Sequence, residues 1–162
     1  MRSGYPVTMR IARFNHDDTV SYAFVQKDDN DSRDYLVELD GYPLGAQPVS
    51  PTGRRFAADG DGIRLLAPVI PSKVYGLAKN YKDPSANIAG SDASGQFPVI
   101  FTKPATSVIG PDDPIVLPAF SRRMNYEPEL AVVIGRIAKN VSAADAMAYV
   151  LGYTCVNDAT LL

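Results

Sequence analysis

Two glutamates stand one residue apart at the head of an apolar run in the second half of the chain. Glu127 and Glu129 flank Pro128, and residues 130–134 that follow are all apolar and end at Gly135. The run predicts a buried β-strand. Because residues i and i+2 of a strand point to the same side about 6.6 Å apart, we expect both carboxylates to lie side by side at the strand entrance.

Carboxylates in that position repel each other and lose hydration, so a cation is their natural partner. Oxygen ligands without nearby His or Cys suit Mg²⁺ or Mn²⁺ better than Zn²⁺. We therefore predict Glu127 and Glu129 as metal ligands. The spacing alone leaves the alternative open that they are two exposed glutamates at a strand end.

A third carboxylate follows further along the chain. Residues 153–156 predict another strand, which delivers Asn157 and Asp158 at its end. A strand–helix–strand excursion can bring Asp158 back beside the glutamates, where three carboxylates would nearly neutralise and partly coordinate a divalent ion. An ordinary Asn-Asp turn is the alternative for this pair taken alone.

Lys103 is the candidate catalytic residue. It follows a predicted strand over residues 98–102 and precedes Pro104, so we expect it at the end of that strand. A lysine there can pair with a substrate carboxylate or with the acids of the metal site, although a solvated lysine is the ordinary alternative.

Three segments, taken in order, resemble the fumarylacetoacetate hydrolase family. Residues 101–110 fit the family pattern F-x-K-P-x-x-S-x-x-G, residues 126–135 fit Y-E-x-E-L-A-V-V-I-G, and residues 152–158 fit G-Y-T-x-x-N-D. The resemblance covers roughly residues 65–160. It implies that Glu127, Glu129 and Asp158 are the metal-binding carboxylates of part of a mixed β-roll catalytic domain, and that the protein is a homodimer.

The resemblance also implies a reaction class. A small 2-oxo acid can chelate Mg²⁺ (or Mn²⁺) through its carboxylate and keto oxygens, and the ion then stabilises the enolate left when a C–C bond breaks. This chemistry serves hydrolysis of acylpyruvates or fumarylacetoacetate, decarboxylation of oxaloacetate-like acids, and isomerisation of the hydroxymuconate-type acids of aromatic compound catabolism. The sequence does not select one of these reactions.

Two departures from the family pattern support a different expectation. Many members carry N-Y-x-x-H-x-x-E, whereas this chain has Pro84 and Asn87 where the His and Glu would stand, and neither residue can transfer a proton. The family also continues after N-D with further strands, while this sequence stops at Leu162. The alternative prediction is therefore a truncated or catalytically silent member of the family that binds a metal or ligand.

The remaining elements predict a mainly β (α+β) chain. We expect an extension over residues 1–8, a small N-terminal β domain over 9–63 with strands at 9–14, 19–26 and 35–40, and an incomplete catalytic domain over 64–162. Residues 83–96 predict a loop over the site. A capping pattern at Ser142 predicts a helix up to Leu151, with Met147 packed in the core.

Composition restricts the class and the partners. The chain has 162 residues, 46% hydrophobic and 21% charged, with a net charge of −2, which indicates a globular protein and no nucleic-acid partner. No apolar run is long enough to span a membrane. Its single cysteine, Cys155, excludes an internal disulfide and favours a reducing compartment, so we expect a cytoplasmic protein.

Overall fold

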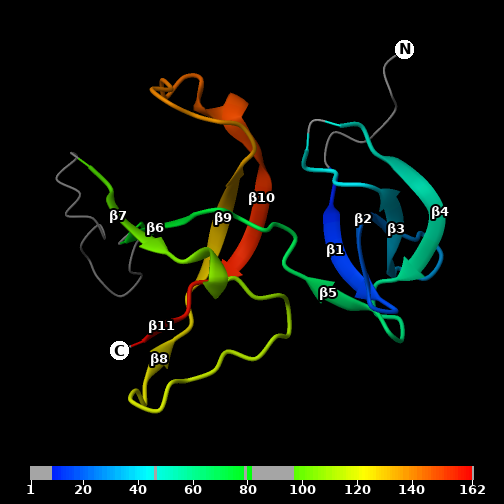
Figure 1. Cartoon of the computed structure of the whole chain (residues 1–162), viewed down its shortest axis with the longest axis horizontal. Helices are drawn as coiled ribbons and strands as arrows, with labels where there is room; N and C mark the ends of the chain where they lie inside the picture. The colour runs from blue at the N-terminus through cyan, green and yellow to red at the C-terminus, as the bar shows by residue number, and fades with distance from the viewer. Residues whose placement is uncertain (1–8, 46, 79, 82–96, 162) are drawn as a thin grey trace. The chain divides into compact units, whose positions relative to one another are not determined.

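The computed structural model describes residues 9–45, 47–78, 80–81 and 97–161 (Figure 1). These residues fall into two compact units. The first unit runs through Gly41 and resumes from Val49 to Asp113, and the second contains Tyr42–Pro48 and the residues from Pro114 onward. Strands dominate both units, and the described helical segments are two short 3₁₀ turns. The prediction of a mainly β chain with a small N-terminal β unit is confirmed.

The first unit is built on a five-stranded antiparallel sheet. Its strands are β1 (Ile11–His16), β2 (Thr19–Lys27), β3 (Asp34–Asp40), β4 (Ser50–Ala57) and β5 (Arg64–Leu66), in the order β4-β3-β2-β1-β5. Apolar side chains of the three central strands form the core, where Phe14, Ala23 and Leu36 are fully buried. The three strands predicted from the sequence correspond to β1–β3.

Local turn chemistry sets the register of this sheet. Asp17 and Asp18 both have positive φ and join β1 to β2 in a two-residue hairpin, the backbone geometry that matches the twist of the paired strands. Between β3 and β4 the register shifts at Glu38. Gly53 has a φ of +91° in the shifted part of β4, which only a residue without a side chain adopts easily.

A second antiparallel pair follows in the same unit. Strand β6 (Val74–Ala78) pairs with β7 (Val99–Lys103). The ring of Phe101 lies directly over Gly76. A Cβ at position 76 would come within 2.1 Å of this ring, so the close contact requires glycine. The predicted lid loop over residues 83–96 and the substituted positions Pro84 and Asn87 lie outside the described residues.

The second unit consists of two short antiparallel pairs. Strand β9 (Pro128–Ile134) pairs with β10 (Val150–Asn157), and β8 (Met124–Asn125) pairs with β11 (Thr160–Leu161). Leu151 is an extra residue in β10 and forms a bulge opposite the step from Val133 to Ile134. Side chains along β9 alternate between exposed and half-buried positions. The prediction of a strand here is therefore confirmed, whereas the prediction that it is buried is wrong.

The predicted helix before β10 is also wrong. Ser142 and Asp145 do form the expected cap, with the Asp145 N–H donating to Ser142 Oγ and Ser142 Oγ donating to the Asp145 carboxylate. The turn that follows is a single 3₁₀ segment, Ala146–Tyr149, and the chain then enters β10. Met147 is 66% exposed and contributes to no core. No helix in the described part of the chain has the length and apolarity that a membrane span requires.

Candidate metal centre

The three candidate metal ligands lie where two strand ladders meet. Glu127 stands between β8 and β9, and Asp158 stands between β10 and β11. The same two segments therefore pair on both sides of this junction, once as β9 with β10 and once as β8 with β11. Glu129 lies two residues into the longer pair and faces Val156 across it.

Backbone and side-chain hydrogen bonds fix the junction. The Asp158 N–H donates to the Glu127 carbonyl oxygen at 2.8 Å, so these two residues lie opposite each other. The Glu127 N–H donates to Oδ1 of Asn157 at 2.9 Å, across 30 residues of sequence. Since partners across a ladder and residues two apart along a strand share a face, the pairing turns all three carboxylates to one side.

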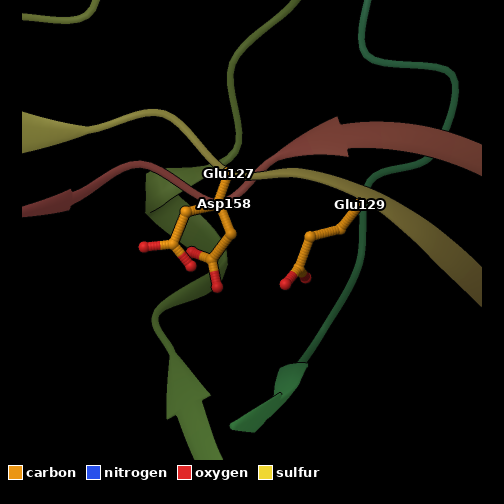
Figure 2. Close-up of side chains that lie close together, drawn as sticks. All are labelled: Glu127, Glu129 and Asp158. Carbon is orange, nitrogen blue, oxygen red and sulfur yellow. The ribbon is translucent and has the colours of Figure 1, made fainter. Parts of the chain in front are cut away.

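The carboxylates consequently form a tight cluster (Figure 2). One oxygen from each of Glu127, Glu129 and Asp158 lies within 4.8 Å of the other two. Glu127 and Glu129 are half-buried, and Oδ1 of Asp158 is buried from solvent. At such separations each pair of ionised carboxylates repels by roughly 1 kcal/mol even in water, so the arrangement favours a cation at its centre.

The donor set fits a hard divalent cation. Mg²⁺ and Ca²⁺ lie about 2.0–2.6 Å from their oxygen ligands, so ligands on opposite sides of the ion are about 4–5 Å apart. The oxygens of the cluster lie within that span. Three carboxylates would also leave coordination positions open, because both ions accept six or more ligands. The structure brings together the three predicted ligands, and their role in binding a metal remains a prediction.

The other predicted site residue lies in the first unit. Lys103 is the last residue of β7, as the sequence predicted, and its side chain is half-buried. Ser107 follows it in the 3₁₀ turn Ala105–Ser107 and donates from Oγ to the Pro104 carbonyl at 2.8 Å. This bond accounts for the serine of the F-x-K-P-x-x-S pattern as a local turn residue. The catalytic role of Lys103 stays a prediction.

Asn157 is the residue that the sequence analysis did not assign. Its amide side chain accepts the bond from the Glu127 backbone, so it positions one candidate ligand while the next residue supplies another. The available signal was its place directly before Asp158, where an Asn side chain readily bonds a backbone group.

Two protein families match successive parts of the chain. Residues 9–68 match the family described as Rv2993c-like, N-terminal, and residues 73–161 match fumarylacetoacetate (FAA) hydrolase, C-terminal. The second match includes Lys103 and all three carboxylates. The first covers the five-stranded sheet.

Curated proteins that are similar to this chain are considerably longer than the region that matches it. Protein Rv2993c of Mycobacterium tuberculosis is 41% identical over 152 residues, which are 93% of this chain and 55% of that protein. A mitochondrial oxaloacetate tautomerase of Xenopus laevis is 41% identical over 97 residues, which are 59% of this chain and 30% of that protein. The chain spans about half, or less, of the length of these relatives.

Solved structures agree with both the fold and the family. The 2-hydroxyhepta-2,4-diene-1,7-dioate isomerase of Mycobacterium marinum superposes with a TM-score of 0.74 at 39% identity, covering 94% of this chain and 55% of that one. The 5-carboxymethyl-2-hydroxymuconate delta-isomerase of Mycobacterium smegmatis gives 0.75 at 39% identity, with the same coverage. On these matches, the chain belongs to the fumarylacetoacetate hydrolase family.

Proposed function

We propose that the chain is part of a divalent-metal-dependent enzyme that acts on a C–C bond of a small 2-oxo or dicarboxylic acid. The observation that supports this most directly is the cluster of three carboxylate oxygens within 4.8 Å of one another. Family membership supports an enzyme of this general type, and the metal and the reaction are the parts that we propose. A homodimer and a cytoplasmic location belong to the same proposal.

Each site residue has a distinct task in this proposal. Glu127, Glu129 and Asp158 would bind Mg²⁺ or Mn²⁺, and the pairing across the ladder junction keeps their side chains on one face. The bound ion would supply Lewis-acid stabilisation of the negative charge that develops on a 2-oxo acid. Lys103 would bind a substrate carboxylate through its ammonium group.

The names of the relatives favour a reaction that rearranges the substrate. Two solved relatives are named as isomerases, and one curated relative is named as an oxaloacetate tautomerase. Pro84 and Asn87 do not distinguish among the reactions, because hydrolysis, isomerisation and tautomerisation all require proton transfer and neither residue can transfer a proton. Among the three reactions open to the family, we place isomerisation first because of these names.

The first test is a calorimetric titration of the full chain with Mn²⁺. We expect binding at one site, and we expect Glu127→Gln to weaken it at least tenfold, about 1.4 kcal/mol of binding free energy, because one charged ligand is lost. Asp18→Asn is the matched control, since it removes one negative charge from an exposed turn in the other unit and should leave the affinity unchanged. Equal affinities of wild type and Glu127→Gln would contradict the assignment.

A second candidate function is a catalytically silent metal-binding member of the family. The substitution of Pro84 and Asn87 for an acid/base pair favours it. Incubating the full chain with oxaloacetate and with hydroxymuconate-type acids, with Mn²⁺ and with a chelator, separates the two candidates. Metal-dependent product that disappears in Glu127→Gln supports the enzyme, whereas Mn²⁺ binding without product from any of these acids supports the silent binder.

A further inference from the structure

Arg64 and Asp113 form an ion pair although they lie 49 positions apart in the sequence. Nη2 of Arg64 donates a hydrogen bond to Oδ1 of Asp113. The residues between them include both strands of the β6–β7 pair and Lys103, the last residue of β7. The chain therefore leaves the N-terminal sheet after Arg64 and comes back into contact with the same residue at Asp113.

The starting point of this excursion is attached to the core of the first unit. Arg64 begins β5, the edge strand that pairs with β1, and the next residue, Leu65, stands opposite Phe14. Phe14 is fully buried, and Leu65 packs against the same buried cluster. The backbone of Arg64 is thus held by a sheet with a packed core.

The returning end is held by the second oxygen of the same carboxylate. Oδ2 of Asp113 accepts a hydrogen bond from the Gly110 N–H at 2.8 Å. Gly110 also lies against β5, because a Cβ there would come within 3.2 Å of the Leu65 carbonyl oxygen and of Leu66 Cα. The Arg64 guanidinium, and after it the Gly110 N–H, hold the pKa of Asp113 below its ordinary value. An ionised Asp113 therefore ties Gly110 to β5.

The excursion itself has few features that fix its position. Among the described residues, β6 and β7 form a sheet of only two strands, and such a ladder is marginally stable by itself. Residues 104–109, which join Lys103 to Gly110, are exposed apart from half-buried Ala105. Segments that bury so little open locally at low free energy. The contacts at the base of the excursion therefore matter for where Lys103 lies.

We propose that Arg64 and Asp113 are positioning residues for Lys103, so that the N-terminal sheet takes part in substrate binding by holding the segment that contains this lysine. We call the Arg64–Asp113 pair the β5 clamp. A group that binds substrate must be held within about 0.5 Å of its productive position, and charge-assisted hydrogen bonds such as those of the clamp are the strong ones. The inference rests on the proposed function in one respect, the binding of a substrate carboxylate by Lys103.

The first readout is the acetylation rate of Lys103 in the full chain, followed by mass spectrometry with limiting acetic anhydride. Asp113→Asn removes the charge that Arg64 binds, so we expect half-buried Lys103 to be acetylated at least threefold faster. Asp112→Asn is the matched control, because it removes the same charge from the exposed neighbouring residue, whose φ of +61° Asn also tolerates. The control should leave the rate unchanged.

Variants of Arg64 test the clamp from the other side. Arg64→Met should accelerate acetylation of Lys103 as much as Asp113→Asn does, whereas Arg64→Lys keeps a positive charge and should restore at least half of the protection. The Arg64 side chain is 64% exposed, so Arg64→Met decides the question if Asp113→Asn fails to fold. An unchanged acetylation rate of Lys103 in Arg64→Met would overturn the proposal.

The second readout is calorimetric binding of 2-oxoglutarate, a stable 2-oxo dicarboxylic acid, to the full chain saturated with Mn²⁺. We expect Asp113→Asn to weaken binding at least fivefold when Lys103 is present and less than 1.5-fold in a Lys103→Met background, because the clamp acts through Lys103. Equal losses in both backgrounds would also overturn the proposal, since the clamp would then act on the chain as a whole.

The two readouts separate this inference from the proposed function. A wild type that does not bind 2-oxoglutarate, or that binds it as well as Lys103→Met does, would count against the proposed task of Lys103. Faster acetylation of Lys103 in Asp113→Asn and Arg64→Met would still support the β5 clamp in that case, because acetylation requires neither metal nor substrate.

Discussion

Asn157 and Asp158 are neighbours in sequence with different roles at the candidate metal centre. Asp158 contributes an oxygen to the carboxylate cluster, whereas Asn157 accepts a hydrogen bond from the Glu127 N–H and so positions a candidate ligand on the opposite segment. Strand periodicity alone places Glu127 beside Glu129, whereas Asp158 was predicted from the returning strand that precedes it and from the family resemblance. The task of Asn157 was not predictable, because it depends on which backbone N–H lies opposite after β9 and β10 have paired.

The position of Asn157 leads to a prediction at this scale. Asn157→Ala removes the acceptor of the Glu127 N–H, so we expect Mn²⁺ affinity to fall about threefold to tenfold, since one hydrogen bond contributes about 0.5–1.5 kcal/mol. Asn157→Asp retains an acceptor oxygen and should recover the affinity, which calorimetry on the full chain measures. Asn125→Ala in β8 is the control for loss of an exposed amide nearby, and an equal loss in that variant would refute a specific role for Asn157.

At the scale of elements, a buried carboxylate ties together three strands of the N-terminal sheet. Glu38 in β3 is 3% exposed, and it accepts hydrogen bonds from Ser21 of β2 and from Thr52 and Arg54 of β4. Because the register shifts between Val37 and Leu39, residues 52–54 of β4 lie opposite Glu38, and this segment contains both β4 donors. Burial by itself raises the pKa of Glu38, but the hydrogen bonds from Thr52, Arg54 and Ser21 outweigh burial and hold the pKa below its ordinary value.

This network predicts an acid-dependent stability. The lowered pKa means that ionised Glu38 stabilises the fold above its ordinary pKa of 4.5, and that this contribution is lost as the pH falls through the lower pKa of the folded state. Glu38→Gln should cost about 1–3 kcal/mol at pH 7 and flatten the loss of stability below pH 4.5. Urea unfolding of the first unit between pH 3 and 7 tests this, with exposed Asp40→Asn as the control. Parallel pH profiles for wild type and Glu38→Gln would contradict it.

The same strands explain which elements were predictable. β1 to β3 carry alternating apolar residues, and the sequence identified them. β4 contains Pro51, Gly53 and two arginines, a composition that no strand pattern favours. It nevertheless forms a strand at the edge of the sheet, because its backbone pairs with β3 and Arg54 forms an ion pair with Glu38. The predicted helix at residues 142–151 was wrong because its last two residues, Val150 and Leu151, belong to β10.

At the scale of the whole chain, burial is distributed unevenly. The buried apolar side chains of the described residues, Phe14, Ala23, Leu36 and Leu39, all lie in the N-terminal sheet. β9 was expected to be buried from its run of Leu, Val and Ile. A strand can bury such a run only where another layer covers it, and sequence patterns do not reveal which layers are present.

This distribution predicts a gradient of hydrogen exchange in the full chain. Amides of β1 to β3 should exchange at least about 100-fold more slowly than those of β9 and β10, because opening free energies follow local burial. Exchange followed by mass spectrometry at peptide resolution tests this. Equal protection of the peptides that contain Ala23 and Val132 would show that the second unit has a core of its own.

The bulge at Leu151 has an evolutionary consequence. A one-residue deletion in an ordinary strand turns every later side chain to the opposite face of its sheet. β10 already contains one residue more than its partner, and loss of Leu151 would restore a regular ladder without changing the partners of residues 152–157. Related sequences could therefore lose this one residue during evolution, and Asp158 would still lie on the same face of the sheet as Glu127.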